Sequence, residues 1–177
     1  MEVFAVTPQT LGADDLIDYL SKQGSDIYKQ GIAPLDDKAL FNMTSNQTVM
    51  LTEAFLNCTT AKGSKQITTF TNISGVAVDI IKSYGQIDEA TLKTACERFC
   101  KAGKADAKTH AKQNNTMMSM CLNKSLTATA KASLLTYRAE YTFDGVEYAP
   151  LMYKIIMRLA TIDSVAITQT LCDNLQN

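Results

Sequence analysis

Apolar residues in the last third of the chain recur at spacings of three and four, the period of an amphipathic helix. The clearest stretch follows Pro150, which fits the first turn of a helix because its missing N–H would have no partner there. Lys154 and Arg158 fall on the opposite side, so we expect one buried stripe and one face in water. The apolar positions of this predicted helix are Leu151, Met152, Ile155, Ile156, Leu159 and Ala160.

Single residues mark the starts and ends of two helices that precede this stretch. Thr127 can accept a hydrogen bond from the first turn of a helix that continues to Tyr141. The pair Asp144-Gly145 then predicts a turn before the next helix. Asp88 can cap an earlier helix in the same way as Thr127, because its carboxylate can accept from the first backbone N–H groups.

Two more helices are expected from weaker patterns. Gly103 interrupts the chain after the helix capped by Asp88, and a polar helix with lysines along one side follows it. Asp163 or Ser164 can cap a separate final helix, in which polar residues dilute the apolar positions. That final helix is expected to be marginal unless it docks against other elements.

The first half of the chain is patterned less clearly. Residues 3–6 can form a short strand in an extended arm, and Asp14 or Asp15 can begin a short helix. Residues 47–58 favour a helix. Residues 66–71 favour a strand within a loop rich in threonine, serine and lysine.

These patterns and the composition predict a mainly α-helical protein, a helical bundle with a short extended N-terminal arm. Aromatic residues make up 7% of the 177 positions and Trp is absent, which fits helices better than an all-β fold. A chain of this length favours one or two domains. The predicted segments are an N-terminal arm and helical segment at residues 1–60, a loop or linker at 61–75 and a C-terminal helical bundle at 76–177.

The number of cysteines and the lengths of the apolar runs indicate in which cellular compartment the protein is expected. Five cysteines are an odd number, and the chain starts without a basic and apolar signal sequence, so a secreted disulfide framework is not expected. No apolar run approaches the roughly 20 residues that span a bilayer. We therefore expect a cytoplasmic protein in a reducing environment, with no membrane partner.

Charge is segregated along the chain although the net charge is only −1. Residues 1–60 carry three lysines against eight acids, whereas residues 61–112 carry nine basic residues against five acids. Such asymmetry can guide contact between like subunits or turn a mildly basic face toward a nucleic acid. An ordinary solvated face is the simpler explanation of a row of lysines at helical spacing, and RNA contact is the alternative. The candidate RNA contacts in this row are Lys101, Lys104, Lys108 and Lys112.

Catalytic and metal-binding patterns are not evident in the sequence. Cys96 and Cys100 share one predicted helix face, but a four-ligand zinc site would need more distant partners, and His110 is the only histidine. Paired carboxylates fall where helix caps are expected, and no phosphate-binding or calcium-binding loop occurs. We therefore predict no enzyme, no catalytic residue and no cofactor.

The stretch "SLTATAKASLLTYRAEYTFDGVEYAPLMYKIIMRLATIDSVAITQTL" resembles the capsid-like Gag region of copia-type LTR retrotransposons. The resemblance lies in a block of the form L-T-x-x-A-K-x-x-L, a following Tyr, a linker and an apolar helix that leads into an "I-D" pair. It covers about 50 residues, and the upstream "ALFNMTSNQT" fits more loosely. The chain departs from the family pattern by lacking the Trp of many such proteins and the C-x2-C-x4-H-x4-C knuckle.

The resemblance implies an all-helical structural protein that forms homo-oligomeric particles around RNA. The missing knuckle puts sequence-specific RNA recognition in doubt. Tyr148 and Met152, which flank the turn at Gly145, are the candidate contacts between subunits. The alternatives are a monomeric helical adaptor that binds a partner in a groove, and an enzyme with an unrecognised site around His110.

Overall fold

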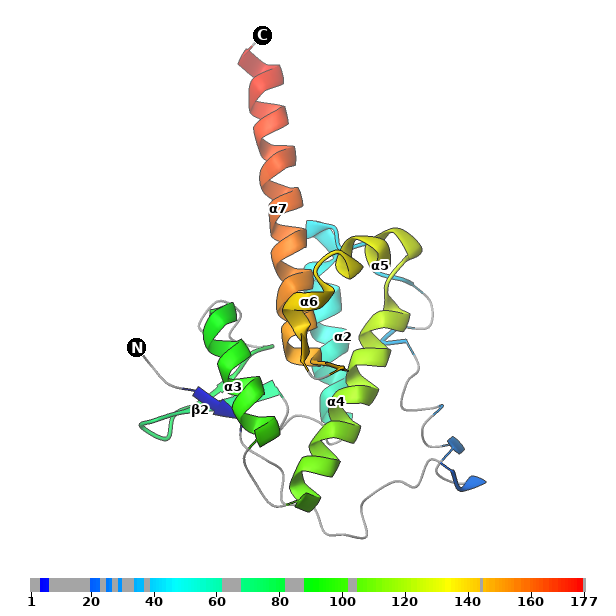
Figure 1. Ribbon diagram of the computed structural model, residues 1–177. Coiled ribbons are helices and arrows are strands. Elements are labelled where there is room, and N and C mark those ends of the chain that lie inside the picture. Colours follow the sequence, from blue (N-terminus) through cyan, green and yellow to red (C-terminus); the bar gives the residue numbers. More distant parts are fainter. Residues whose placement is uncertain are drawn as a thin grey trace.

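The computed structural model describes residues 4–6, 20–22, 25–26, 29, 34–36, 39–61, 68–81, 88–101, 105–143 and 145–176. Six α-helices and one short 3-10 helix dominate these residues, so the fold is mainly α-helical, as predicted (Figure 1). The helical elements are η2 (Ser45–Gln47), α2 (Thr48–Ala61), α3 (Glu89–Lys101), α4 (Ala105–Ser125), α5 (Ala128–Leu135), α6 (Arg138–Tyr141) and α7 (Ala149–Gln176).

Two small antiparallel sheets accompany the helices. In the first, β2 pairs with both neighbours in the order β1-β2-β3, and the register places Val6 opposite Phe70 and Phe70 opposite Val78. The second is a hairpin whose turn contains Gly145, at a φ of 76° that glycine adopts without strain. The strands are β1 (Phe4–Val6), β2 (Thr69–Asn72), β3 (Ala77–Asp79), β4 (Thr142–Phe143) and β5 (Val146–Glu147).

Helix α7 is the central element of the body. Its first part is surrounded by α3, α4, α5 and α6 and by the η2 turn, and all residues from 151 to 156 are buried. The prediction of a wet face through Lys154 is therefore wrong: the side chain is 5% exposed, because neighbouring helices cover α7 on more than one side. Arg158, one turn later, is only partly exposed.

The predicted separate final helix is also wrong. Helix α7 runs for 28 residues and passes through Asp163 and Ser164 without a break. Asp and Ser are good caps but are tolerated inside a helix, because their unfavourable helix propensity is small and the backbone hydrogen bonds of the helix continue through them. As a result, the second half of α7 projects away from the body in Figure 1.

The local caps agree with the sequence. The Thr127 side chain accepts a hydrogen bond from the backbone N–H of Ala130 and so starts α5. The Asp88 carboxylate accepts from the hydroxyl and the backbone N–H of Thr91, and these bonds lower the pKa of Asp88. The strand predicted at residues 3–6 is observed as β1, and that predicted at 66–71 as β2. The helix predicted from Asp14 or Asp15 lies outside the described residues.

Phe41, which precedes the η2 turn, links this part of the chain to the junction of α4 and α5. Phe41 forms a parallel bridge with Leu126: its N–H donates to the carbonyl of Ser125, and its carbonyl accepts from the N–H of Thr127. The Ser125 hydroxyl accepts from the N–H of Leu35 at 2.7 Å. Phe41 is buried, so this crossing belongs to the core.

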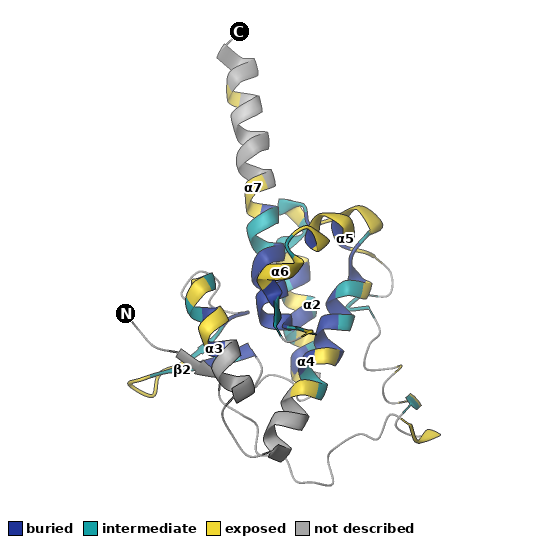
Figure 2. Cartoon of the chain, viewed as in Figure 1, coloured by how far each residue is buried: buried dark blue, intermediate teal, exposed yellow. Residues whose placement is uncertain are grey.

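One hydrophobic cluster draws on all three predicted segments of the chain. Phe55 from α2, Phe70 from β2 and Leu122 from α4 are all fully buried in it. Figure 2 shows the buried residues concentrated where the first half of α7 lies beside α2 and α4. The boundary predicted at residues 61–75 thus does not separate two cores.

Candidate functional site

The predicted lysine row is divided between two helices. Lys101 is the last residue of α3, and α4 begins at Ala105, so only Lys108 and Lys112 share one helix. Lys112 is exposed, and the structure describes Lys108 through its backbone alone. Lys104 lies outside the described residues. The structure thus places Lys101 on a different helix from Lys108 and Lys112.

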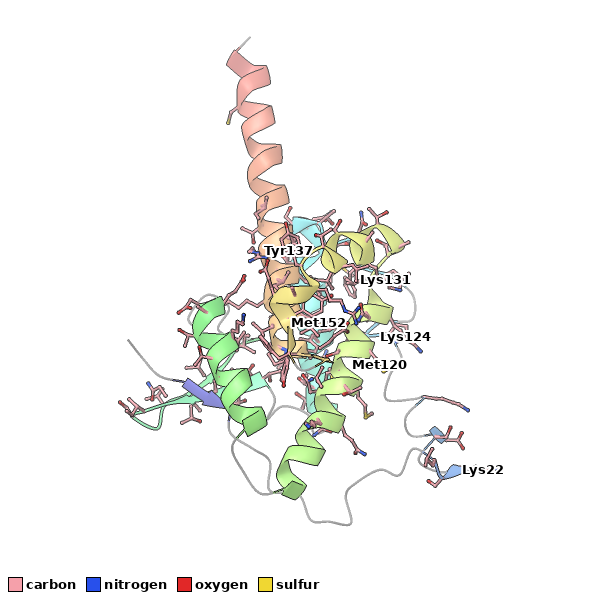
Figure 3. All side chains as sticks on the ribbon, viewed as in Figure 1. Lys22, Met120, Lys124, Lys131, Tyr137 and Met152 are labelled. Atoms are coloured by element: carbon pink, nitrogen blue, oxygen red, sulfur yellow. The ribbon has the colours of Figure 1, made fainter. Side chains whose placement is uncertain are left out.

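The two predicted subunit contacts are part of the core. Tyr148 is 6% exposed, and its ring centroid lies 5.2 Å from that of Phe143. Met152 is fully buried and lies within the helical body (Figure 3). Neither side chain reaches a neighbouring molecule from this position, so the prediction of an assembly interface at these residues is corrected. Their apolar character serves the packing of α7.

The residues considered for metal binding or catalysis are divided between two helices. Cys96 and Cys100 lie in α3 and His110 lies in α4, each described through the backbone. Within the described part of the chain, no three His, Cys, Asp or Glu residues are grouped to hold a metal ion. Among the described helices, none has the length and apolar character needed to cross a membrane.

A charged cluster fixes α7 to two other helices. The Arg158 guanidinium contacts the Glu89 carboxylate of α3 at 2.6 Å and the Glu140 carboxylate of α6 at 3.0 Å. It also lies 5.1 Å from the ring centroid of Tyr137. One arginine thus binds both carboxylates, because the planar guanidinium carries two terminal nitrogen atoms that can each donate to a different acid. This cluster positions elements and carries no reactive group.

Lys154 lies one turn before Arg158 on α7. Its burial lowers the pKa of the ammonium below the ordinary 10.5, and the carboxylates of Glu89 and Asp88 raise it and offset part of that effect. Because the pKa of Lys154 is lower in the folded chain than in the unfolded chain, the unfolded chain binds more protons at pH values between these two pKa values. Stability therefore increases as the pH rises through that alkaline interval.

We expect Lys154→Met to remove this pH dependence and to raise the free energy of unfolding at neutral pH. Methionine keeps the length of the side chain without a charge to desolvate. Urea unfolding at several pH values between neutrality and about 10.5 measures both effects. Lys131→Met, at an exposed position of α5, is the matched control and should change neither quantity. A slope that persists in the Lys154 variant contradicts the assignment.

The most distinctive surface lies where α7 leaves the body. Helix α5 and the η2 turn, which leads directly into α2, both contact α7 at this end of the molecule (Figure 1). Large apolar side chains are exposed on α2, α5 and α7, and we name them together the exit surface: Val49 (66% exposed), Met50 (52%), Leu135 (59%) and Ile162 (57%).

An apolar groove accompanies the exit surface. It is a shallow depression, open to solvent, between the η2 turn, the first turns of α2 and the middle of α7. Thr44, Gln47 and Thr48 form its polar edge. Its apolar lining consists of Phe41, Met43, Leu51, Ile156, Met157 and Ala160. Apolar side chains are therefore accessible to solvent at the base of the projecting part of α7, both in the groove and on the exit surface.

Sequence reasoning missed this surface because its members are scattered. Val49 and Met50 lie in a weakly patterned helix, and Ile162 directly precedes the predicted cap of a separate final helix. α2 packs against α7 through contacts such as that of Phe55 with Tyr153, and the local sequence does not reveal this packing. No family model, curated protein or solved structure matches this chain. The resemblance to copia-type Gag proteins therefore stays a prediction.

Proposed function

We propose that this chain is a capsid-like structural protein that assembles with copies of itself into homo-oligomeric particles and packages RNA. The observation that carries the proposal is the projection of α7 beyond the body, with exposed apolar residues at its base. Exposed apolar residues gathered at one place on a soluble domain are typical of interaction sites.

The physical argument concerns the stability of the projecting half of α7. Isolated helices shorter than about 12 to 15 residues are marginal in water, and most helical stability in proteins comes from packing. The whole helix of 28 residues is about 42 Å long at 1.5 Å per residue, and the buried residues among its described side chains lie between Ala149 and Ala160. Apolar residues continue along the projecting part at Val165, Ile167, Leu171 and Leu175. In the proposed assembly a neighbouring subunit packs against this part of the helix.

The resemblance of residues 125–171 to Gag proteins supports the same function. That stretch includes α5, α6 and most of α7, and the exit surface is formed by residues of α5 and α7 together with α2. RNA is the cargo that the resemblance implies. Lys124 and Lys131 are exposed on α4 and α5 (Figure 3), and such lysines can contact phosphate groups without reading the sequence.

The mass of the purified protein as a function of concentration and salt tests the proposal. Light scattering after gel filtration should show oligomers or particles that form at higher concentration, and electron microscopy should show their shape. Absorbance at 260 and 280 nm then reports whether they contain RNA. A strict monomer at about millimolar concentration would rule out self-assembly and favour a helical adaptor that binds a partner in the groove.

Charged substitutions on the exit surface should weaken assembly. We expect Val49→Glu and Ile162→Glu each to raise the concentration needed for half-maximal assembly by at least about tenfold, since a buried charge at an interface costs more than about 1.4 kcal/mol. Both positions are exposed, so the monomer should remain folded.

Ile73→Glu is the matched control for these substitutions. Ile73 is also an apolar residue, 84% exposed, but it lies at the turn between β2 and β3, away from α7. Its substitution should leave assembly unchanged. Equal losses of assembly in all three variants would point to a general effect of charge and contradict a role of the exit surface.

A further inference from the structure

Two cysteines from different helices are in contact inside the body. The Sγ atom of Cys58 in α2 lies 3.7 Å from the Sγ atom of Cys121 in α4. Neither residue is in a disulfide. Cys121 is buried, whereas Cys58 is partly exposed. The two sulfur atoms are 63 residues apart in sequence, so their contact is a product of the fold.

The contact has the geometry from which a disulfide can form. A disulfide needs a sulfur separation of about 2.05 Å, roughly 1.7 Å closer than the present one, and small rotations of two side chains can supply that movement. Cys172, the other cysteine whose side chain is described, is exposed near the end of α7. It lies on the projecting part of the helix, far along the chain from the body's core.

We propose that Cys58 and Cys121 form a redox-responsive pair that reacts with low-molecular-weight disulfides. This inference does not depend on self-assembly. Cys58 reacts first because it is the more exposed of the two, and its thiolate attacks one sulfur of the small disulfide. A mixed disulfide forms on Cys58, and one small thiol leaves.

Cys121 completes the exchange. Its thiolate attacks the Sγ atom of Cys58, the Cys58–Cys121 bond forms, and the second small thiol leaves. The two protein thiols lose two protons and two electrons in all, and the small disulfide is reduced to two thiols. A reducing environment reverses the reaction, so the state of the pair follows the thiol balance of the compartment.

The bond would join α2 to α4, two helices that both contact α7. α2 packs against α7 through Phe55 and Tyr153, and the loop closed by the bond contains β2, β3 and α3. The carbonyl of Cys121 accepts from the Ser125 hydroxyl at 2.6 Å, which holds this turn of α4 in place. Oxidation therefore reinforces the core without requiring a rearrangement of helices.

The test uses the full chain treated with oxidised glutathione. Intact-mass measurement should show a loss of about 2 Da, and peptide mapping without reduction should recover residues 58 and 121 in one linked peptide. The thermal midpoint should rise by on the order of 10 °C and return after treatment with dithiothreitol.

Variants separate this pair from the other cysteines. Cys58→Ala and Cys121→Ala should each abolish the reversible rise in the thermal midpoint, whereas Cys172→Ala should retain it. Peptide mapping of the unsubstituted chain decides the matter even where a variant does not fold. Recovery of Cys58 and Cys121 only as thiols or as separate glutathione adducts would overturn the proposal.

Discussion

Replacing Phe55 by alanine is expected to lower the free energy of unfolding by about 3 to 5 kcal/mol. The Phe55 side chain is fully buried, and its ring centroid lies 5.1 Å from that of Tyr153 on α7. Its removal leaves a cavity between α2 and α7 that the close-packed surroundings cannot fill. Since domains are stable by only about 5 to 15 kcal/mol, this one change takes away much of the total.

Urea unfolding followed by circular dichroism measures the loss at Phe55. Glu53→Ala is the control, because Glu53 is exposed on the same helix and its replacement should change stability by no more than about 0.5 kcal/mol. Tyr153→Phe keeps the aromatic packing but removes the hydroxyl that lies 3.0 Å from the Thr52 hydroxyl, at a cost of about 1 kcal/mol. Equal effects of all three changes would contradict a packed contact between α2 and α7.

Replacing Asn115 by leucine is expected to lower the free energy of unfolding by about 2 to 4 kcal/mol. The Asn115 side chain donates to the carbonyl of Glu147 at 2.6 Å and accepts from the N–H of Ala149 at 2.9 Å. It thereby joins α4 to β5 and to the first residue of α7. Leucine has a similar volume but leaves these buried backbone groups without its two hydrogen bonds.

Ser119 provides the comparison for Asn115. Its hydroxyl donates to the same carbonyl of Glu147 at 2.9 Å, but it makes no bond to Ala149. Ser119→Ala should therefore cost only about 1 kcal/mol. Hydrogen exchange at the Ala149 amide should accelerate in the Asn115 variant and stay nearly unchanged in the Ser119 variant. The opposite order would show that Ser119 is the principal link between α4 and the start of α7.

Sequence reasoning succeeded where a signal is confined to a few neighbouring residues. The caps at Thr127 and Asp88 act on backbone groups three residues away, so the local sequence is sufficient to predict them. Asn115 gave no such signal, because its partners lie 32 and 34 residues away across the hairpin. A polar residue in a polar helix does not reveal by itself that it is buried.

The candidate site could not be predicted for a related reason. Helical spacing shows which residues of α7 are apolar, but the number of helices around them decides which become buried. Lys154 is therefore buried although helical spacing predicts it on the solvent face, and Met152 is buried although it is a predicted subunit contact. Ile162 lies on the same helix, just past the neighbours that would cover it, and is exposed.

The bridge at Phe41 constrains how the chain can fold during its synthesis. Leu35 and Asn42 are held by Ser125 and Thr127, which a ribosome adds 85 to 90 residues later. α2 also needs Tyr153, 101 residues after Thr52, to complete its buried face. Contacts so far apart in sequence form late, because the intervening loop must first be closed. The first half of the chain therefore leaves the ribosome with its apolar faces uncovered and packs only when α7 has emerged.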